Sequence, residues 1–143
     1  MTDKPNPCFI DTNILVYAYS ETEPEKKQIA VQLLTDRSIC MSTQVVNEFI
    51  WIMSSKYRVD MKLLSDVAKT LFLVYRVDIV DDRTIAAAIE VSMRYRLSYW
   101  DSLIVSSAMK MNCPILYSED LQHEQVLEKN ITITNPFLSI SPA

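Results

Sequence analysis

The 143-residue sequence contains no glycine, although average usage of about 7% would give about ten. A Walker A loop and a Rossmann fingerprint both need glycine where the backbone approaches a phosphate, so nucleotide binding by either motif is excluded. Other residues must therefore form any left-handed turns. We expect Asn112 and Asn130 to do so, because asparagine tolerates this conformation best after glycine.

Cysteine and histidine are also scarce. Cys8, Cys40 and Cys113 are odd in number and widely spaced, which opposes a disulfide framework and a zinc site. We expect three buried thiols in or beside strands, in a reducing compartment. The single histidine, His123, has no serine or cysteine nucleophile motif to serve, and we expect it at the surface.

Long apolar runs and excess positive charge are both missing. No apolar stretch approaches the ~20 residues of a membrane span, and residues 1–7 lack the apolar core of a signal peptide. We therefore expect a soluble, cytoplasmic protein. The net charge of −4 opposes a broad nucleic-acid footprint, so any contact with nucleic acid must be local.

The composition, with 49% hydrophobic and 22% charged residues, is that of a globular protein, and the length suits a single domain over 1–143 with a core at about 7–134. Short apolar runs alternate with longer amphipathic stretches, which predicts an α/β fold with a mainly parallel sheet. Strands are predicted near 7–10, 38–41, 77–80, 114–118 and 131–134, and helices over about 14–19, 24–36, 43–57, 61–75, 83–95 and 101–111.

Four acidic residues stand where such a fold would bring them to one edge of its sheet: Asp11, Glu48, Asp101 and Asp120. The first and last follow predicted strands, at the carboxyl edge where open α/β sheets bind ligands. The other two lie on predicted helices. Clustered carboxylates are costly unless a cation neutralises them, so the pattern predicts a divalent metal site.

Each acid also has a structural interpretation. Asp11 could cap the helix that follows it, and Glu48 borders the apolar stripe of its helix, where glutamates are usually solvated. After the strand at 114–118, either Glu119 or Asp120 could be the metal ligand, and a plain polar loop is the alternative.

Asp101 lies on the apolar face of its predicted helix, where an acid needs a partner. The competing interpretation is a capping box, in which Ser98 caps the helix and Asp101 reaches back to it. Leu97 and Trp100 indicate that the start of this helix is partly buried.

Together these motifs resemble the PIN domain, and most closely the small bacterial VapC toxins. The resemblance covers about residues 7 to 134. It rests on Phe9-Ile10-Asp11-Thr12-Asn13, on the helical Glu48, on Leu97-Ser98-Tyr99-Trp100-Asp101-Ser102-Leu103-Ile104 and on Leu116-Tyr117-Ser118-Glu119-Asp120. It implies a three-layer α/β/α sandwich with a mainly parallel sheet of four to five strands.

The resemblance also implies a metal-dependent endoribonuclease. The four acids would hold Mg²⁺ or Mn²⁺, which prefer such oxygen ligands, and the metal would activate a water for attack on an RNA phosphodiester. Thr12, Asn13 and Ser118 match polar positions that orient the acids or the phosphate. The sequence departs from the family where a glycine often follows the last acid, because Leu121 follows Asp120.

Such proteins are toxins that commonly dimerise and are inhibited by a small antitoxin. The resemblance therefore implies an RNA substrate, whether tRNA, rRNA or mRNA, together with an antitoxin and a second copy of the chain. Aromatic residues that could serve either protein interface, if they are not core residues, are Trp51, Tyr57, Tyr95 and Tyr99.

Two other functions stay open. A phosphomonoesterase of the haloacid dehalogenase type usually has a second aspartate two residues after the first, where this chain has Asn13. A receiver-like regulatory module would also hold Mg²⁺. The third predicted strand is followed by Asp81 and Asp82, but no lysine follows the strand at 114–118, as a receiver requires.

Overall fold

The computed structural model describes residues 6–140. Residues 1–5, on which the expected lack of a signal segment partly rests, and residues 141–143 lie outside the described part. At the centre is a six-stranded sheet in the order β3-β2-β1-β4-β6-β5. Its strands are β1 (Pro7–Ile10), β2 (Ser38–Ser42), β3 (Arg76–Asp78), β4 (Ile115–Tyr117), β5 (Val126–Leu127) and β6 (Ile131–Thr134).

The predicted strands are all present, and the first five in the sheet order are parallel to one another. The sheet has one more strand than predicted. This strand, β5, has two residues and runs antiparallel to β6. Two residues are too few to show the alternation of side chains by which a strand is recognised in a sequence.

Between residues 6 and 140 six helices connect the strands, each where the apolar periodicity predicts one. They are α1 (Thr12–Tyr19), α2 (Pro24–Asp36), α3 (Thr43–Ser55), α4 (Met61–Val74), α5 (Asp82–Tyr95) and α6 (Tyr99–Lys110). α1 and α6 begin two residues earlier than predicted because Asp11 and Ser98 cap them. α5 begins with a full capping box between Asp81 and Thr84.

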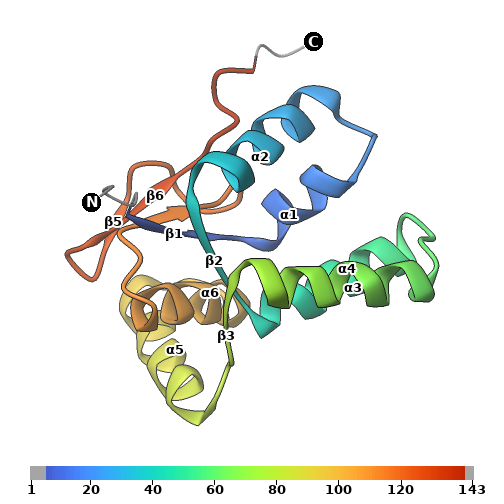
Figure 1. Cartoon of the computed structure of the whole chain (residues 1–143). Helices are drawn as coiled ribbons and strands as arrows, with labels where there is room; N and C mark the ends of the chain where they lie inside the picture. Colours follow the sequence, from blue (N-terminus) through green and yellow to red (C-terminus); the bar gives the residue numbers. More distant parts are fainter. Residues whose placement is uncertain (1–5, 141–143) are drawn as a thin grey trace, which may run out of the picture.

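Helices cover both faces of the sheet, which gives the three layers predicted. α1 and α2 lie above the sheet in Figure 1, α5 and α6 lie below it, and α3 and α4 extend to one side. β1 is central, and Phe9 and Ile10 on it are fully buried. No helix in the described part of the chain has the length and apolar character that crossing a membrane requires.

The cysteines are buried free thiols, as predicted. Cys8 lies on β1, Cys40 lies on β2, and Cys113 lies two residues before β4. Each is at most 1% exposed. They pack as small hydrophobic residues in the core.

Residues other than glycine form the left-handed turns. Asn112 has φ 56°, as predicted. The expectation for Asn130 is wrong, because Glu128 and Lys129 have φ 50° and 71° instead. These two are the central residues of a tight turn between β5 and β6, closed by a hydrogen bond from the Asn130 N–H to the Leu127 carbonyl at 3.2 Å. A turn of this type needs positive φ at both central positions.

Arg96 ends α5 with φ 57° and ψ 37°. A residue with a Cβ atom pays about 1–2 kcal/mol for this conformation. We expect Arg96→Gly to raise the free energy of unfolding by about 1 kcal/mol, measured by urea denaturation. The control is Arg83→Gly inside the same helix, which should lower it by roughly 0.5–1 kcal/mol. A loss of stability in Arg96→Gly would contradict the left-handed conformation at this residue.

Candidate active site

The four predicted acids line one small pocket of about 130 Å³. Asp11 directly follows β1, and Asp120 lies three residues after β4. Glu48 comes from α3 and Asp101 from α6. The structure therefore brings together, at the carboxyl edge of the sheet, side chains that are up to 109 positions apart in the sequence.

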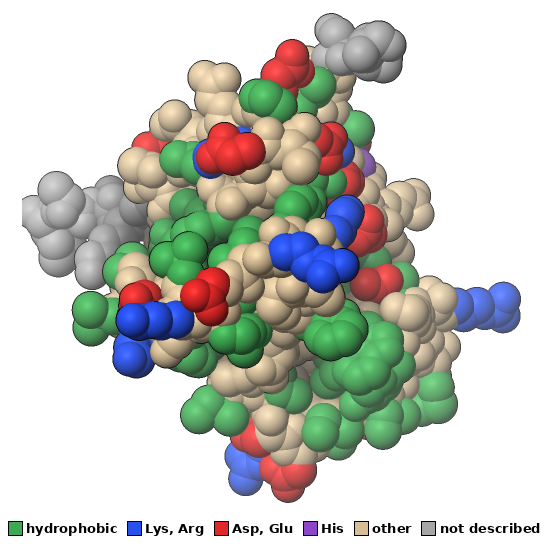
Figure 2. All heavy atoms as spheres, turned by 90° about the vertical axis from the view of Figure 1, so that its right-hand side faces the viewer, with side chains coloured by type: hydrophobic (Ala, Val, Ile, Leu, Met, Phe, Trp, Pro, Cys, Tyr) green, Lys and Arg blue, Asp and Glu red, His purple; other side chains and the backbone are tan. Residues whose placement is uncertain are grey.

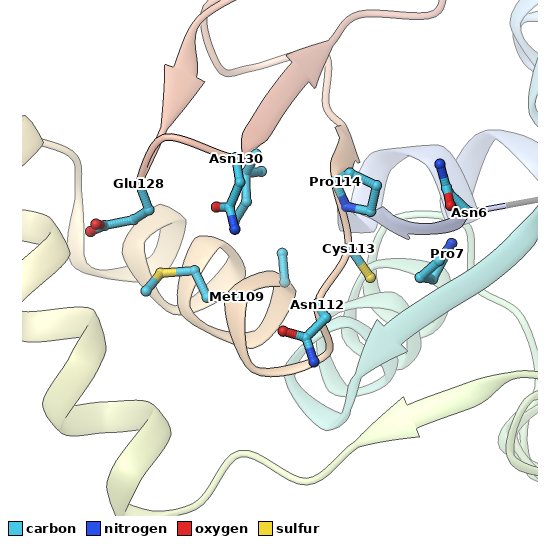
Figure 3. A pocket seen from close by; sticks show the side chains of 10 residues that line it. Asn6, Pro7, Met109, Asn112, Cys113, Pro114, Glu128 and Asn130 are labelled. Carbon is cyan, nitrogen blue, oxygen red and sulfur yellow. The ribbon is translucent and has the colours of Figure 1, made fainter.

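A larger hollow of about 610 Å³ lies at the opposite edge, near the start of β1 and β4 (Figure 3). Asn6, Asn112 and Asn130 line it, and none of the four acids does. The chemistry of the side chains, rather than the size of the cavity, marks the candidate site.

Asp11 is the most buried of the four acids, with 7% of its surface exposed. Its Oδ1 accepts a hydrogen bond from the Thr12 N–H at 2.7 Å, and its Oδ2 accepts one from the Ser118 hydroxyl at 2.9 Å. Asp11 therefore both caps α1 and lines the pocket. Burial raises the pKa of Asp11 to about 6 against the opposing effect of these hydrogen bonds, and the charges of Asp101 and Asp120 raise it further.

Two polar residues after Asp11 hold two of the other acids. The Thr12 hydroxyl donates to Glu48 Oε1 at 2.6 Å, and the Asn13 amide donates to Asp120 Oδ2 at 3.1 Å. The first turn of α1 thus contacts both α3 and the loop after β4. Thr12 and Asn13 are therefore placed where they could orient the two acids, the role that the resemblance implies for them.

Of the two acids after β4, only Asp120 lines the pocket. Glu119 points elsewhere, with its Oε1 accepting from the Tyr17 hydroxyl at 2.7 Å and its Oε2 from Lys26 Nζ at 2.6 Å. Both carboxylate oxygens of Glu119 therefore have donors outside the pocket. Lys26 also lies 4.8 Å from the centre of the Tyr17 ring, so this ion pair fixes the loop against α1 and α2.

The loop that carries Asp120 holds its shape without glycine. The Ser118 hydroxyl oxygen accepts hydrogen bonds from the N–H groups of Asp120 and Leu121, both at 3.2 Å, while donating to Asp11. Leu121 is not among the residues with positive φ, so the backbone at this position does not require glycine.

The start of α6 differs from expectation. The Ser98 hydroxyl accepts from the Asp101 N–H at 3.1 Å, which is one half of the predicted capping box. Of the two residues that predict a partly buried start of this helix, Leu97 packs against the core, whereas Trp100 is 62% exposed. The helix begins at Tyr99, which places Trp100 in its first turn on the solvent side.

Gln44 lines the pocket but is not among the residues predicted from the sequence. It lies one helical turn before Glu48 on α3, a spacing that puts both side chains on the same face. Its amide donates to the Trp100 carbonyl at 3.1 Å and so joins α3 to α6.

The remaining candidates lie outside the pocket. His123 is partly exposed, and its Nδ1 accepts from the Asn135 N–H at 3.0 Å, which gives it a structural role. Trp51 and Tyr99 are 71% and 37% exposed, whereas Tyr57 and Tyr95 pack against the core.

The donors around the pocket suit a hard divalent cation. Its lining contains four carboxylates and no lysine or arginine, and carboxylate oxygens are the ligands that Mg²⁺ and Mn²⁺ prefer. Within residues 6–140, no three acid, histidine or cysteine side chains already form a ligand group, so a cation would have to draw the carboxylates inward.

The chain matches the family model of the PIN domain over residues 8–129. It belongs to the PIN domain family. No curated protein sequence matches the chain.

Several solved structures share the PIN fold. VapC20 from Mycobacterium tuberculosis, described as a toxin that cleaves the sarcin–ricin loop, has 18% identity and a TM-score of 0.66, over 79% of this chain and 89% of its own. VapBC2 from Rickettsia felis, bound to a promoter DNA fragment, has 18% identity and a TM-score of 0.62, over 90% and 98%. A toxin–antitoxin complex from Klebsiella pneumoniae has 15% identity and a TM-score of 0.66, over 90% and 97%.

The buried charge of Asp11 should make metal-free protein less stable as pH rises. The folded-state pKa of about 6 lies above the unfolded value of about 3.9, so stability falls between these pH values and stays lower above them. We expect metal-free Asp11→Asn to be more stable than wild type at pH 8 by about 2–3 kcal/mol, with no difference near pH 3.5, in urea denaturation.

Mg²⁺ at millimolar concentration should then stabilise wild type more than Asp11→Asn. The control is Asp66→Asn, which changes an exposed aspartate of α4 and should follow wild type at each pH. Equal stability of wild type and Asp11→Asn at pH 8 without metal would contradict a charge cost at this site.

Proposed function

We propose that this protein is an endoribonuclease that depends on Mg²⁺ or Mn²⁺, and that it is the toxin of a toxin–antitoxin pair acting in the cytoplasm. The observation that carries the proposal is the convergence of four carboxylates from four separate segments on one pocket of a PIN domain. The RNA-cleaving activity described for VapC20, which shares the fold, supports RNA as the substrate.

In this proposal Asp11, Glu48, Asp101 and Asp120 hold the metal. A metal held by these residues would supply an activated water for in-line attack on the phosphodiester and would stabilise the charge that develops on the phosphate. The polar neighbours keep the carboxylates in place, because Thr12 bonds Glu48, Asn13 bonds Asp120, and Ser118 bonds Asp11.

The receiver-like alternative receives no support from the acids near β3. Asp81 accepts hydrogen bonds from the Thr84 N–H and hydroxyl at the start of α5, and it also pairs with Lys110 at 3.2 Å. Lys110 lies 3.3 Å from Asp78 as well. These acids already have structural partners and do not line the pocket.

A phosphomonoesterase is not favoured either, because the amide of Asn13 occupies the place of its second aspartate and bonds Asp120.

An antitoxin partner is part of the proposal. The similar structures from Rickettsia felis and Klebsiella pneumoniae contain toxin–antitoxin pairs. Hydrophobic side chains gather on the lower half of the face in Figure 2, and a large exposed apolar surface is typical of a protein interface. A small protein should co-purify with the tagged chain from its native cells and inhibit RNA cleavage. Recovery of uninhibited chain alone would oppose this partner.

We also propose a homodimer that uses α5. Ile85, Ile89 and Met93 form an exposed row along this helix. An antiparallel two-fold pair centred on Ile89 would place Ile85 opposite Met93 of the second copy, and Asp82 opposite Arg96. Sedimentation should show a dimer that Ile89→Glu dissociates. The proposed dimer would be contradicted if wild type still sedimented as a monomer at concentrations 100-fold higher than those used in the activity assay.

Replacing a metal-holding carboxylate by its amide should abolish cleavage and leave the fold intact. We expect Asp101→Asn and Glu48→Gln each to lower the rate on purified tRNA and rRNA on the order of 100-fold or more, because the amide is a much weaker metal ligand. Asp66→Asn is the matched control and should cut at the wild-type rate. EDTA should stop wild-type cleavage, and Mn²⁺ should restore it.

Calorimetry separates the possible causes of inactivity. Both inactive variants should bind Mn²⁺ more weakly than wild type while their unfolding transitions remain cooperative. Wild-type cleavage rates in Asp101→Asn, or discrete RNA fragments in EDTA, would overturn the proposed function.

A further inference from the structure

A second hollow adjoins the acidic pocket. Its volume is about 400 Å³, and it shares Gln44, Glu48 and Trp100 with the acidic pocket. We call it the Trp100 pocket. Because three residues line both cavities, a group held in the Trp100 pocket lies directly beside any phosphate held at the acids.

Two aromatic side chains form one wall of the Trp100 pocket. Trp100 is 62% exposed and Tyr99 is 37% exposed, and their rings meet edge to face at 5.4 Å between centres. Leu103, which is 4% exposed, adds an apolar surface to the same hollow. An uncovered indole beside an apolar surface is suited to stacking against a flat ring.

Two amide side chains, those of Asn47 and Gln44, also line the Trp100 pocket. Asn47 is exposed, and its carboxamide makes no hydrogen bond to other residues between 6 and 140. Gln44 is only 9% exposed, and its Oε1 has no partner in the described part of the chain. A buried acceptor without a donor is unfavourable, so a donor brought to the junction of the two pockets would be stabilised there.

We propose that the Trp100 pocket binds the nucleobase next to the scissile phosphodiester, with Trp100 stacked on its face and Asn47 bonded to its edge, so that the base at this position decides which bonds are cut. This inference rests on the proposed nuclease function and specifies its substrate. A flat ring with donors and acceptors on its edge, joined to a phosphate one residue away, matches both cavities at once. A base inside a duplex is stacked on both faces and paired at its edge, and it cannot enter.

The charge of the surface agrees with this mode of binding. Neither cavity is lined by lysine or arginine, and the net charge is −4, so the affinity cannot come from many phosphate contacts. Stacking on Trp100 and hydrogen bonding to Asn47 supply the local contacts instead. Asn47 is then the residue that discriminates between bases.

The two tryptophans permit a direct binding test. Trp51→Phe leaves Trp100 as the only indole, and Trp100→Phe leaves Trp51, which is 71% exposed on α3 and lines neither cavity. The probes are fluorescein-labelled single-stranded oligouridylate, oligoadenylate and oligocytidylate of eight nucleotides and an eight-base-pair RNA duplex, in Ca²⁺. Single strands should quench Trp100 emission and leave Trp51 emission unchanged, and the duplex should quench neither.

Cleavage provides the second readout. Trp100→Ala should lower kcat/KM on an unstructured RNA on the order of 10-fold, mainly through KM, and Trp100→Phe should restore part of the loss. Asn47→Ala should change which base is preferred beside the cut. Trp51→Ala is the control and should match wild type.

The outcomes separate this inference from the proposed function. If wild type cuts RNA and Trp100→Ala cuts the same bonds at the same rate, the base site is wrong and the nuclease stands. RNA binding seen by anisotropy without quenching of Trp100 would also overturn the base site. Ile85 of the exposed row on α5 also lines the Trp100 pocket, so if Trp100→Ala abolishes only self-association or antitoxin binding, the surface is a protein interface and the base site is wrong. If wild type neither binds nor cuts RNA in Mg²⁺ or Mn²⁺, the nuclease proposal itself has failed.

Discussion

The burial of Asp11 beside Asp101 and Asp120 at one edge of the sheet is the constraint on which the rest of this structure depends. Asp11 is nearly buried, and its pKa is raised to about 6, first by burial and further by the charges of Asp101 and Asp120. No lysine or arginine in the described part of the chain lines the pocket to offset these charges. The fold therefore maintains an arrangement that is unfavourable by itself and that a divalent cation would stabilise.

Neutral hydrogen-bond donors, and not counter-charges, hold three of the acids, Asp11, Glu48 and Asp120, in place. Thr12 and Ser118 each donate a hydroxyl hydrogen to one carboxylate, and both are almost fully buried. Lys26, whose charge opposes the rise that burial causes in the pKa of Asp120, is paired with Glu119 outside the pocket. This division leaves the pocket acids available for a metal while the neighbouring ion pair anchors the loop after β4.

The sequence predicted most of the fold, and also that the four acids lie together, because both depend on regular patterns. Apolar periodicity located each helix, and the acids stood at strand ends or on helix faces that a parallel sheet brings together. The exposure of Trp100 was not predicted, and the left-handed turn was wrongly assigned to Asn130, because each depends on one local residue, the Ser98 cap and Glu128 of the turn. Gln44 carried a helical spacing to Glu48, but its contact with α6 follows only from tertiary packing.

The most direct test of the central claim is a crystal structure of the protein soaked in Mn²⁺, with anomalous diffraction recorded to locate the ion. The account predicts an anomalous peak at the carboxyl edge of the sheet, with oxygens of Asp11 and Asp101 as ligands at about 2.0–2.2 Å. It also predicts that the peak is lost in Asp101→Asn. A peak elsewhere on the molecule, or none at this edge with millimolar Mn²⁺, would contradict the account.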